Sequence, residues 1–158
     1  MIGSPCDIAS INTSGSITCD CTATGDIEIG TVSGEITFSS VNSDKFNASS
    51  TSGSVKLSNA KVSGAVTIDT VSGEIILNDV ESGSLNTNSV SGEVTFTNLT
   101  SDDVNIDTTS GEVSGTITGD HEYDVDTVSG DISLPSAIKG EAMVVISTVS
   151  GDVDIEAA

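Results

Sequence analysis

Apolar and polar residues alternate on both sides of a Ser-Gly dipeptide that recurs along the whole chain. In the eight copies spaced 19 to 21 residues apart, the position two residues after the glycine is always β-branched and apolar, and the position two further on is apolar in every repeat except the one with Gly115. Alternation with a period of two predicts a strand with one buried face on each side of the dipeptide. The column after the glycine is Ile17, Ile36, Val55, Ile75, Val94, Val113, Ile132 and Val153. The column six residues before the serine is Ile8, Ile27, Phe46, Val66, Leu85, Val104, Tyr123 and Val144.

The dipeptide also sets the period of the chain. It begins at Ser14, Ser33, Ser52, Ser72, Ser91, Ser110, Ser129 and Ser150, at spacings of 19 to 21 residues. A fixed period of this size is typical of a repeat solenoid, in which each coil must stack on the next to bury its inner face. The sequence therefore predicts one all-β domain over residues 1–158. We expect a parallel β-solenoid of about eight coils, right-handed by the general crossover preference.

Each repeat is predicted to run as a strand, a tight Ser-Gly corner, a second strand and a looser return through polar residues. Glycine suits the corner because it enters positive φ without steric cost, and the serine hydroxyl can bond the turn's own backbone. Thr-Val pairs such as residues 70–71 often precede the corner. They predict a ladder of hydroxyls that exchange hydrogen bonds along the rod. We expect the last strand, at residues 153–156, to end the rod with an unpaired edge.

The chain is strongly acidic. It has 24 Asp and Glu residues against 4 basic ones, all lysine, and a net charge of -20. Such a surface repels nucleic acid phosphates and anionic membranes, and no stretch is apolar for long enough to span a bilayer. The expected partners are cations, meaning divalent metal ions, cationic peptides or a basic face on another protein. The alternative is a surface that is only highly soluble.

A column of carboxylates directly follows the corner glycines: Glu35, Glu74, Glu93, Glu112, Asp131 and Asp152. Stacked at about 5 Å, neighbouring carboxylates repel each other by roughly 0.2 to 1 kcal/mol per pair. Bridging Ca²⁺ would offset this repulsion because hard cations prefer oxygen ligands, and a cationic partner would do the same. Alternatively the column only keeps the edge soluble, with water and salt screening the repulsion. No other cofactor is expected.

A second candidate site consists of Asp102, Asp103, His121 and Glu122. The two pairs are 19 residues apart, so in a solenoid stacked in chain order they lie one above the other. With Asp120 and Asp124 nearby, the only histidine of the chain would lie among carboxylates. Such a mixed oxygen and imidazole set can bind a metal ion. The alternative is a polar loop without a ligand.

The three cysteines all lie near the N-terminal end, at Cys6, Cys19 and Cys21. An odd count fits neither a disulfide framework nor a four-ligand zinc site. One disulfide is an alternative, but the pattern favours buried free thiols.

Catalysis is not expected from this sequence. Some parallel β-helices cleave acidic polysaccharides, but they need cations to hold an anionic sugar, and Arg is absent here. The lysines are scattered over different columns, at Lys45, Lys56, Lys61 and Lys139. A third class of function is structural, because open strand edges at the ends would allow copies to associate end to end into filaments.

The corner phrase is specific enough to suggest a family. Thr-Val-Ser-Gly-Glu-Ile stands at residues 31–36 and 70–75, Val-Ser-Gly-Glu-Val at 90–94, Thr-Val-Ser-Gly-Asp-Ile at 127–132 and Thr-Val-Ser-Gly-Asp-Val at 148–153. This phrase resembles the bacterial adhesin-like or "toastrack" domain, a β-solenoid of uncharacterised function, and the resemblance runs along nearly the whole chain.

The resemblance implies a location as well as a fold. Toastrack domains are often attached to membrane-anchored parts of envelope-stress and antimicrobial-peptide-response systems. It therefore implies an extracytoplasmic interaction or scaffold module of the bacterial envelope. Residues 1–10 lack a signal-peptide pattern, so we expect the chain to be a soluble piece of a longer anchored or exported protein. No catalytic residues are established for the family, so none carry over.

Overall fold

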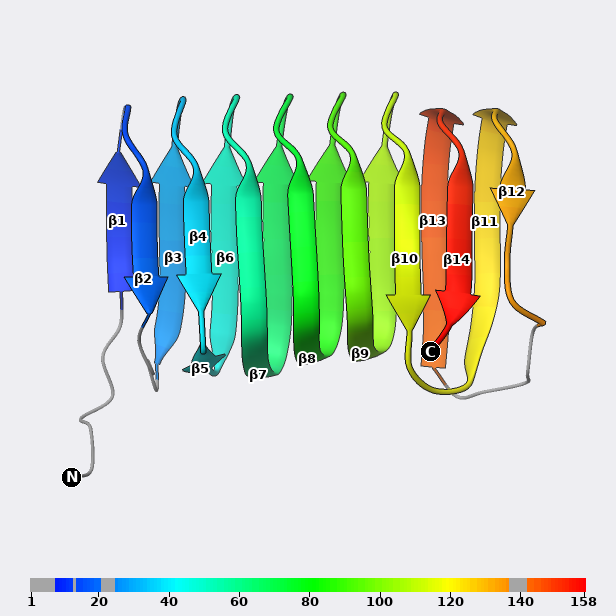
Figure 1. The fold of residues 1–158 in the computed structure, drawn as a ribbon, viewed down its shortest axis with the longest axis horizontal. Coiled ribbons are helices and arrows are strands. Elements are labelled where there is room, and N and C mark those ends of the chain that lie inside the picture. Colours follow the sequence, from blue (N-terminus) through cyan, green and yellow to red (C-terminus); the bar gives the residue numbers. More distant parts are fainter. Residues whose placement is uncertain (1–7, 13, 21–24, 137–141) are drawn as a thin grey trace.

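The computed structural model describes residues 8–12, 14–20, 25–136 and 142–158. These residues form one continuous sheet of 14 strands, wound into a flattened coil (Figure 1). The strands are β1 (Ile8–Asn12), β2 (Ile17–Asp20), β3 (Asp26–Thr31), β4 (Ile36–Ser39), β5 (Asn42–Ser43), β6 (Lys45–Ser50), β7 (Val55–Thr70), β8 (Ile75–Ser89), β9 (Val94–Thr108), β10 (Val113–Ile117), β11 (His121–Ser129), β12 (Ile132–Ser133), β13 (Ala142–Ser150) and β14 (Val153–Ala157).

All strand pairs are parallel, as the predicted β-solenoid requires. We call the strands before each Ser-Gly corner the rear face and those after it the front face; the corners form the apex, and the opposite end is the base. In Figure 1 the chain rises along the rear face, crosses at the apex and descends along the front face as it advances. This path is right-handed. Within the described residues each face has eight rungs; those of the rear face are β1, β3, β6, β7, β8, β9, β13 and β11.

The core is formed by the predicted apolar columns of both faces. In the central rungs these residues are completely buried, and the rings of Phe38 and Phe46 meet edge to face with centroids 5.3 Å apart. Gly115 interrupts its column because the ring and backbone of Phe96 occupy the space that a Cβ would need. Burial is lost at the C-terminal end, where Ile132 and Leu134 are 45% and 36% exposed. The alternating pattern therefore predicted the core correctly in all but the end rungs.

The corner glycines are required by contact between coils and not by positive φ. A Cβ on Gly53, Gly73 or Gly92 would overlap the carbonyl oxygen of the corner glycine in the preceding coil. Only a residue without a Cβ lets the backbones approach this closely. The predicted reason, a positive φ, is wrong at six corners: Gly34, Gly53, Gly73, Gly92, Gly111 and Gly151.

The corner serines bond to the neighbouring coil. Ser91 donates from its backbone N at 3.0 Å and from its Oγ at 3.3 Å to the carbonyl oxygen of Val71, one coil earlier. Ser52, Ser72 and Ser110 make the same pair of bonds. The predicted bond from this hydroxyl to its own turn is therefore wrong, and the serine joins successive coils.

The hydroxyl group two residues before the corner serine bonds within its own coil instead. Thr70 points into the core, and its Oγ1 accepts a hydrogen bond of 2.9 Å from the backbone N of Gly73 in the same coil. Ser50 and Ser89 accept the same bond from their own corner glycines. The predicted exchange of hydrogen bonds along the rod is wrong at these positions, because each hydroxyl stabilises its own corner.

The return at the base is more regular than the sequence suggested. In the central coils it is part of one continuous strand, so that β7, β8 and β9 run through front face, base and rear face. Val41, Ala60, Val80 and Leu99 fill the core above the base. The bend into the base is made by a row of residues in the left-handed region, which short polar side chains tolerate well. These are Ser40, Asn59, Asp79 and Asn98, with φ of 57°, 49°, 51° and 52°.

The last two repeats stack in reverse chain order. Val144 of β13 pairs with Val104 of β9, and Tyr123 of β11 pairs with Val144 from the other side. On the front face β14 likewise lies between β10 and β12. Val153 and Asp154 are thus paired on both sides, and the prediction that residues 153–156 end the rod is wrong, because β12 lies outside them. The outermost rung is formed by β11 and β12 (Figure 1).

The cysteine prediction is wrong at the position the structure describes. Cys19 is disulfide-bonded, whereas the sequence favoured free thiols. Cys6 and Cys21 lie outside the described residues.

Candidate functional site

A ridge of exposed aliphatic side chains runs along the apex. Val32, Val71, Val90 and Val149 are 48 to 50% exposed, and Val128 is 81% exposed. These valines precede the corner serines, so the close contacts of the corner stack them at the rung spacing of about 4.8 Å. We define the valine ridge, in spatial order, as Val32, Thr51, Val71, Val90, Thr109, Val149 and Val128.

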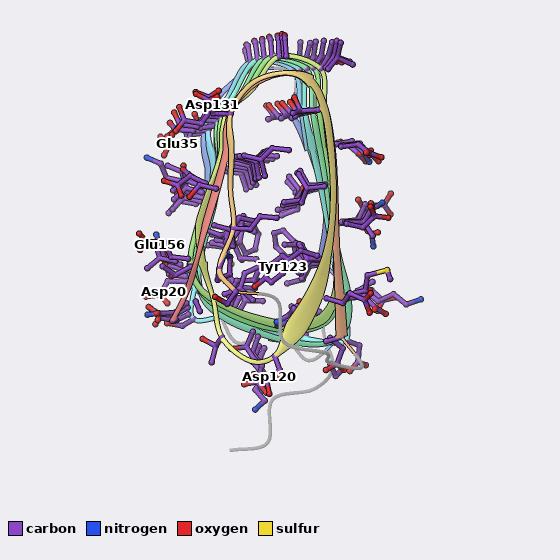
Figure 2. All side chains as sticks on the ribbon, turned by 90° about the vertical axis from the view of Figure 1, so that its right-hand side faces the viewer. Asp20, Glu35, Asp120, Tyr123, Asp131 and Glu156 are labelled. Carbon is purple, nitrogen blue, oxygen red and sulfur yellow. The ribbon has the colours of Figure 1, made fainter. Side chains whose placement is uncertain are left out.

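The predicted acidic column lies beside this ridge on the front face. Figure 2 looks along the coil and shows Glu35 and Asp131 on the outer surface near the apex, far from Asp20 and Glu156. The reversed repeats change the order of the column, because Val113 N donates to the carbonyl of Asp152 and Val153 N to that of Asp131. We define the front acidic row, in spatial order, as Glu35, Ser54, Glu74, Glu93, Glu112, Asp152 and Asp131.

Local contacts offset part of the repulsion within the front acidic row. Lys56, one rung on from Glu35, forms an ion pair with it at 2.9 Å. This bond and the charge of Lys56 lower the pKa of Glu35, and Glu35 raises the pKa of Lys56 in return. Thr37 and Thr95 donate hydroxyl bonds to the glutamates on their own rungs, at 3.3 and 3.1 Å. Among the residues that the structure describes, the Glu112 and Asp131 carboxylates have no such contact, and the Asp152 carboxylate accepts one bond, from Asp131 N at 2.9 Å.

A second polar row borders the valine ridge on the rear face. It consists, in spatial order, of Gly30, Ser49, Asp69, Asn88, Asp107, Ser147 and Asp126, and we call it the rear row. Asn88 donates to Asp69 Oδ1 at 2.7 Å, which separates the two nearest carboxylates by an amide. Between this row and the ridge lies an open groove of about 360 Å³, lined among others by Asp69, Val90 and Val149. The apex therefore presents an apolar strip with carboxylates on both sides.

The second predicted site is not assembled. Met143 of β13 pairs with Asp103 on one side and Glu122 on the other, so a complete rung separates the two acidic residues. The prediction of direct stacking is wrong because it assumed chain order. Asp102 and Asp120 line one groove of about 490 Å³ at the base, where Asp120 is seen in Figure 2.

His121 is buried instead of joining the carboxylates. It is 3% exposed, and its Nε2 lies 2.8 Å from the carbonyl oxygen of Ser101. Since a carbonyl only accepts, Nε2 carries the proton in this bond. Nδ1 is buried without a hydrogen-bond partner. His121 therefore acts as a core residue that fastens the crossing from β10 to β11.

A metal centre is not preassembled in the part of the chain that the structure describes. There, no three His, Cys, Asp or Glu side chains are grouped closely enough to hold an ion. Among the same residues no helix is long and apolar enough to span a bilayer.

Sequence reasoning missed the valine ridge. The prediction from the Thr-Val pairs concerned only the threonine and its hydroxyl. In the structure this threonine is buried, and the valine next to it is exposed. The signal was present, because strict alternation places Val71 outward once Thr70 and Ile68 point inward.

One comparison with known proteins gives a match. The family model described as Toastrack DUF4097 matches residues 9–158, which is nearly the whole chain. No curated protein and no solved structure matches the chain.

Proposed function

This chain belongs to the Toastrack family of domains of unknown function, and we propose that it is a non-enzymatic scaffold that binds a cationic partner along its apex. The observation that carries this proposal is the valine ridge between the front acidic row and the rear row. An exposed apolar strip of this length on a soluble surface is a mark of an interaction site. Carboxylates on both sides select a partner with basic residues around an apolar stripe.

The proposed location is the outside of a bacterial cell, in its envelope. The disulfide at Cys19 supports this, because disulfides persist in oxidising compartments. The attachments typical of toastrack domains support it as well.

A passive scaffold also fits the chemistry of the repeated residues. The corner serines are engaged in bonds between coils, and Lys56 and Lys61 are held in ion pairs with Glu35 and Glu81. Neither the corner serines nor these lysines are positioned to act as a nucleophile or to bind a substrate.

The proposal is tested with a synthetic amphipathic peptide of lysine and leucine, labelled for fluorescence anisotropy. We expect binding to the wild-type domain that weakens as salt is raised. Val71→Thr with Val90→Thr should weaken binding by about tenfold, because each change replaces buried apolar surface by a hydroxyl. The fold should tolerate it, since the chain itself has threonine in this ridge at Thr51 and Thr109.

Charge is tested by a matched pair of double variants. Glu93→Gln with Glu112→Gln removes two charges from the front acidic row, whereas Asp20→Asn with Glu156→Gln removes two charges far from the apex (Figure 2). Only the first pair should weaken peptide binding beyond the small effect of net charge. Equal losses from both pairs, together with no effect of the valine changes, would reduce the interaction to non-specific attraction and contradict the proposal.

Millimolar Ca²⁺ added to the same assay tests the bridging alternative. If Ca²⁺ occupies the front acidic row, it competes with the peptide in the wild type but not in the Glu93→Gln, Glu112→Gln variant. Mg²⁺ at the same ionic strength controls for screening.

A second candidate function is a self-assembling rod. The observation that favours it is the outermost rung, where β11 pairs with β13 on one side and with no further described strand on the other. An open edge of nine residues can accept another strand. Sedimentation velocity over a concentration series should then show species that grow without limit, whereas the scaffold alone stays at one size.

A further inference from the structure

Residues 142–158, which we call the inserted repeat, fill a slot built by earlier parts of the chain. On the rear face β13 lies between β9 and β11, and on the front face β14 lies between β10 and β12. β13 is paired on both sides along most of its length, whereas β14 is paired with β10 throughout and with β12 only at Val153 and Asp154. The two walls of the slot come from residues 94–117 and 121–133, and among the described strands the outer wall pairs with the rest of the sheet only through the inserted repeat.

The slot is apolar inside. The inserted repeat contributes Val144, Ile146, Val153 and Ile155, which are at most 2% exposed. One wall is made by the rung of Val104, Ile106 and Val113, which are likewise buried, and the other by Tyr123 and Val125, which pack against the core. An empty slot would expose both walls, so one repeat of this kind must occupy it.

The connections to the inserted repeat differ from those of the other coils. From β1 to β10 each coil advances by one rung, whereas the chain from β10 to β11 passes over a rung and the chain from β12 to β13 goes back by one. Nothing in the contacts of the slot requires that the repeat comes from the same chain.

We propose that the inserted repeat is exchanged between two copies, so that residues 142–158 of each copy fill the slot of the other and form a reciprocal dimer. Every hydrogen bond and buried contact of the inserted repeat is then re-formed between chains. The exchanged state costs mainly the association entropy and becomes favourable at high protein concentration. The dimer would carry two valine ridges, and a partner with two basic segments would bind it with increased avidity.

In the alternative arrangement, the strands of residues 121–133, which we call repeat 7, stack directly on β9 and β10 in chain order, and the inserted repeat forms the outermost rung. Residues 127–131 and 148–152 have the same sequence, Thr-Val-Ser-Gly-Asp, so both repeats match the corner of the preceding coil. Repeat 7 is the poorer occupant, because it would place Tyr123 between two aliphatic rungs and would bring Pro135, which has no N–H, towards the ladder. This chain-order arrangement is distinguishable from exchange by experiment.

The test uses full-length single-cysteine additions at outward-facing positions in one column. Asn105 and Val145 are register partners on β9 and β13, and Asp124 is the partner of Val145 on β11. Adjacent rungs at about 4.8 Å suit a disulfide, whereas residues two rungs apart, at about 9.6 Å, do not. An Asn105→Cys chain and a Val145→Cys chain are mixed at high concentration in mild denaturant, returned to buffer, oxidised and separated by size.

We expect a dimer fraction in which the 105–145 disulfide joins the two chains, identified by mass spectrometry of the linked peptide. The unsubstituted chain, treated identically, controls for links through the native cysteines. Absence of a dimer, or a dimer without the 105–145 link, overturns the proposal; the second result would indicate end-to-end contact. A 105–124 disulfide within one Asn105→Cys, Asp124→Cys chain would show chain-order stacking and overturn it as well.

Discussion

The central coils and the last two repeats contain the same corner phrase. In the central coils the order of stacking follows the order of the chain, whereas in the last two repeats it does not. In β7, β8 and β9 every inward position is apolar or a small hydroxyl, and every rung has two neighbours. The three strands pair along most of their length, with one shift of register between Val62 and Ala65 of β7. In residues 121–158 the phrase is kept, yet the order of stacking is reversed and the outer rung is half-buried. A repeat phrase thus fixes the shape of a coil, and the residues around it decide which rung the coil occupies.

The difference between repeat 7 and the inserted repeat, which is repeat 8, shows what determines which rung each of them occupies. Repeat 8 has aliphatic residues at all four of its positions in the apolar columns, and all four are buried. Repeat 7 has Tyr123 on one face and a strand of only two residues, Ile132–Ser133, on the other, followed closely by Pro135. An amphipathic ring and a proline are tolerated at an end and costly between two rungs. Repeat 8, whose residues in the apolar columns are all aliphatic, therefore occupies the inner of the two rungs.

The largest expected effect is the difference in lost stability between a central and a terminal residue of the same apolar column. Leu77 is completely buried, and Leu134, in the same column of the outer rung, is 36% exposed. Leu77→Ala should lower the free energy of unfolding by about 2 to 5 kcal/mol, because it leaves a cavity between two packed rungs. Leu134→Ala should lower it by about 1 kcal/mol or less. Urea unfolding followed by circular dichroism measures both, and equal losses would show that the outer rung is packed like the centre.

A smaller effect is expected at the corners. Gly92→Ala forces a Cβ against the carbonyl of Gly73 with coils on both sides, and should cost about 3 kcal/mol of unfolding free energy. Gly34→Ala makes the same kind of contact with Gly15, but the terminal coil that carries Gly15 can shift away, so the cost should be smaller. Thermal unfolding of the two variants gives the comparison. A tolerated Gly92→Ala would contradict the account of the corner as a close contact between coils.

The fold could be predicted from the sequence because its signal is local. Period-two alternation beside a recurring dipeptide identifies strands, and a fixed repeat length leaves stacking as the only way to bury their faces. The reason given for Ser was wrong and the reason given for Gly was wrong at six corners, since these residues contact the neighbouring coil. A single repeat cannot show that contact. It becomes visible only when two coils are placed at their true spacing.

The order of the last repeats was beyond the same reasoning. Stacking in chain order is the default for a solenoid, and the two candidate phrases at residues 127–131 and 148–152 are identical. Which repeat takes the inner rung depends on whether Tyr123 or Val144 packs better there. An alternating pattern of apolar and polar residues counts both simply as apolar. The error passed directly to the site, because Asp103 and Glu122 were predicted to stack directly only on the assumed order.

The smallest expected effect uses Tyr123 as a reporter of the outer rung. Burial raises the pKa of its phenol above the ordinary value of about 10. The neutral form is thus favoured in the folded state, so this contribution to stability is fully present below the unfolded pKa and is lost as pH rises through the folded pKa. Because Tyr123 is the only tyrosine and the chain has no tryptophan, its phenolate absorbance reports this rung alone. The titration midpoint should be higher in buffer than in urea, and Tyr123→Phe should remove the loss of stability above about pH 10. Equal midpoints in the two solvents would mean that the ring is as solvated as in the unfolded chain, and that β11 does not cover the core.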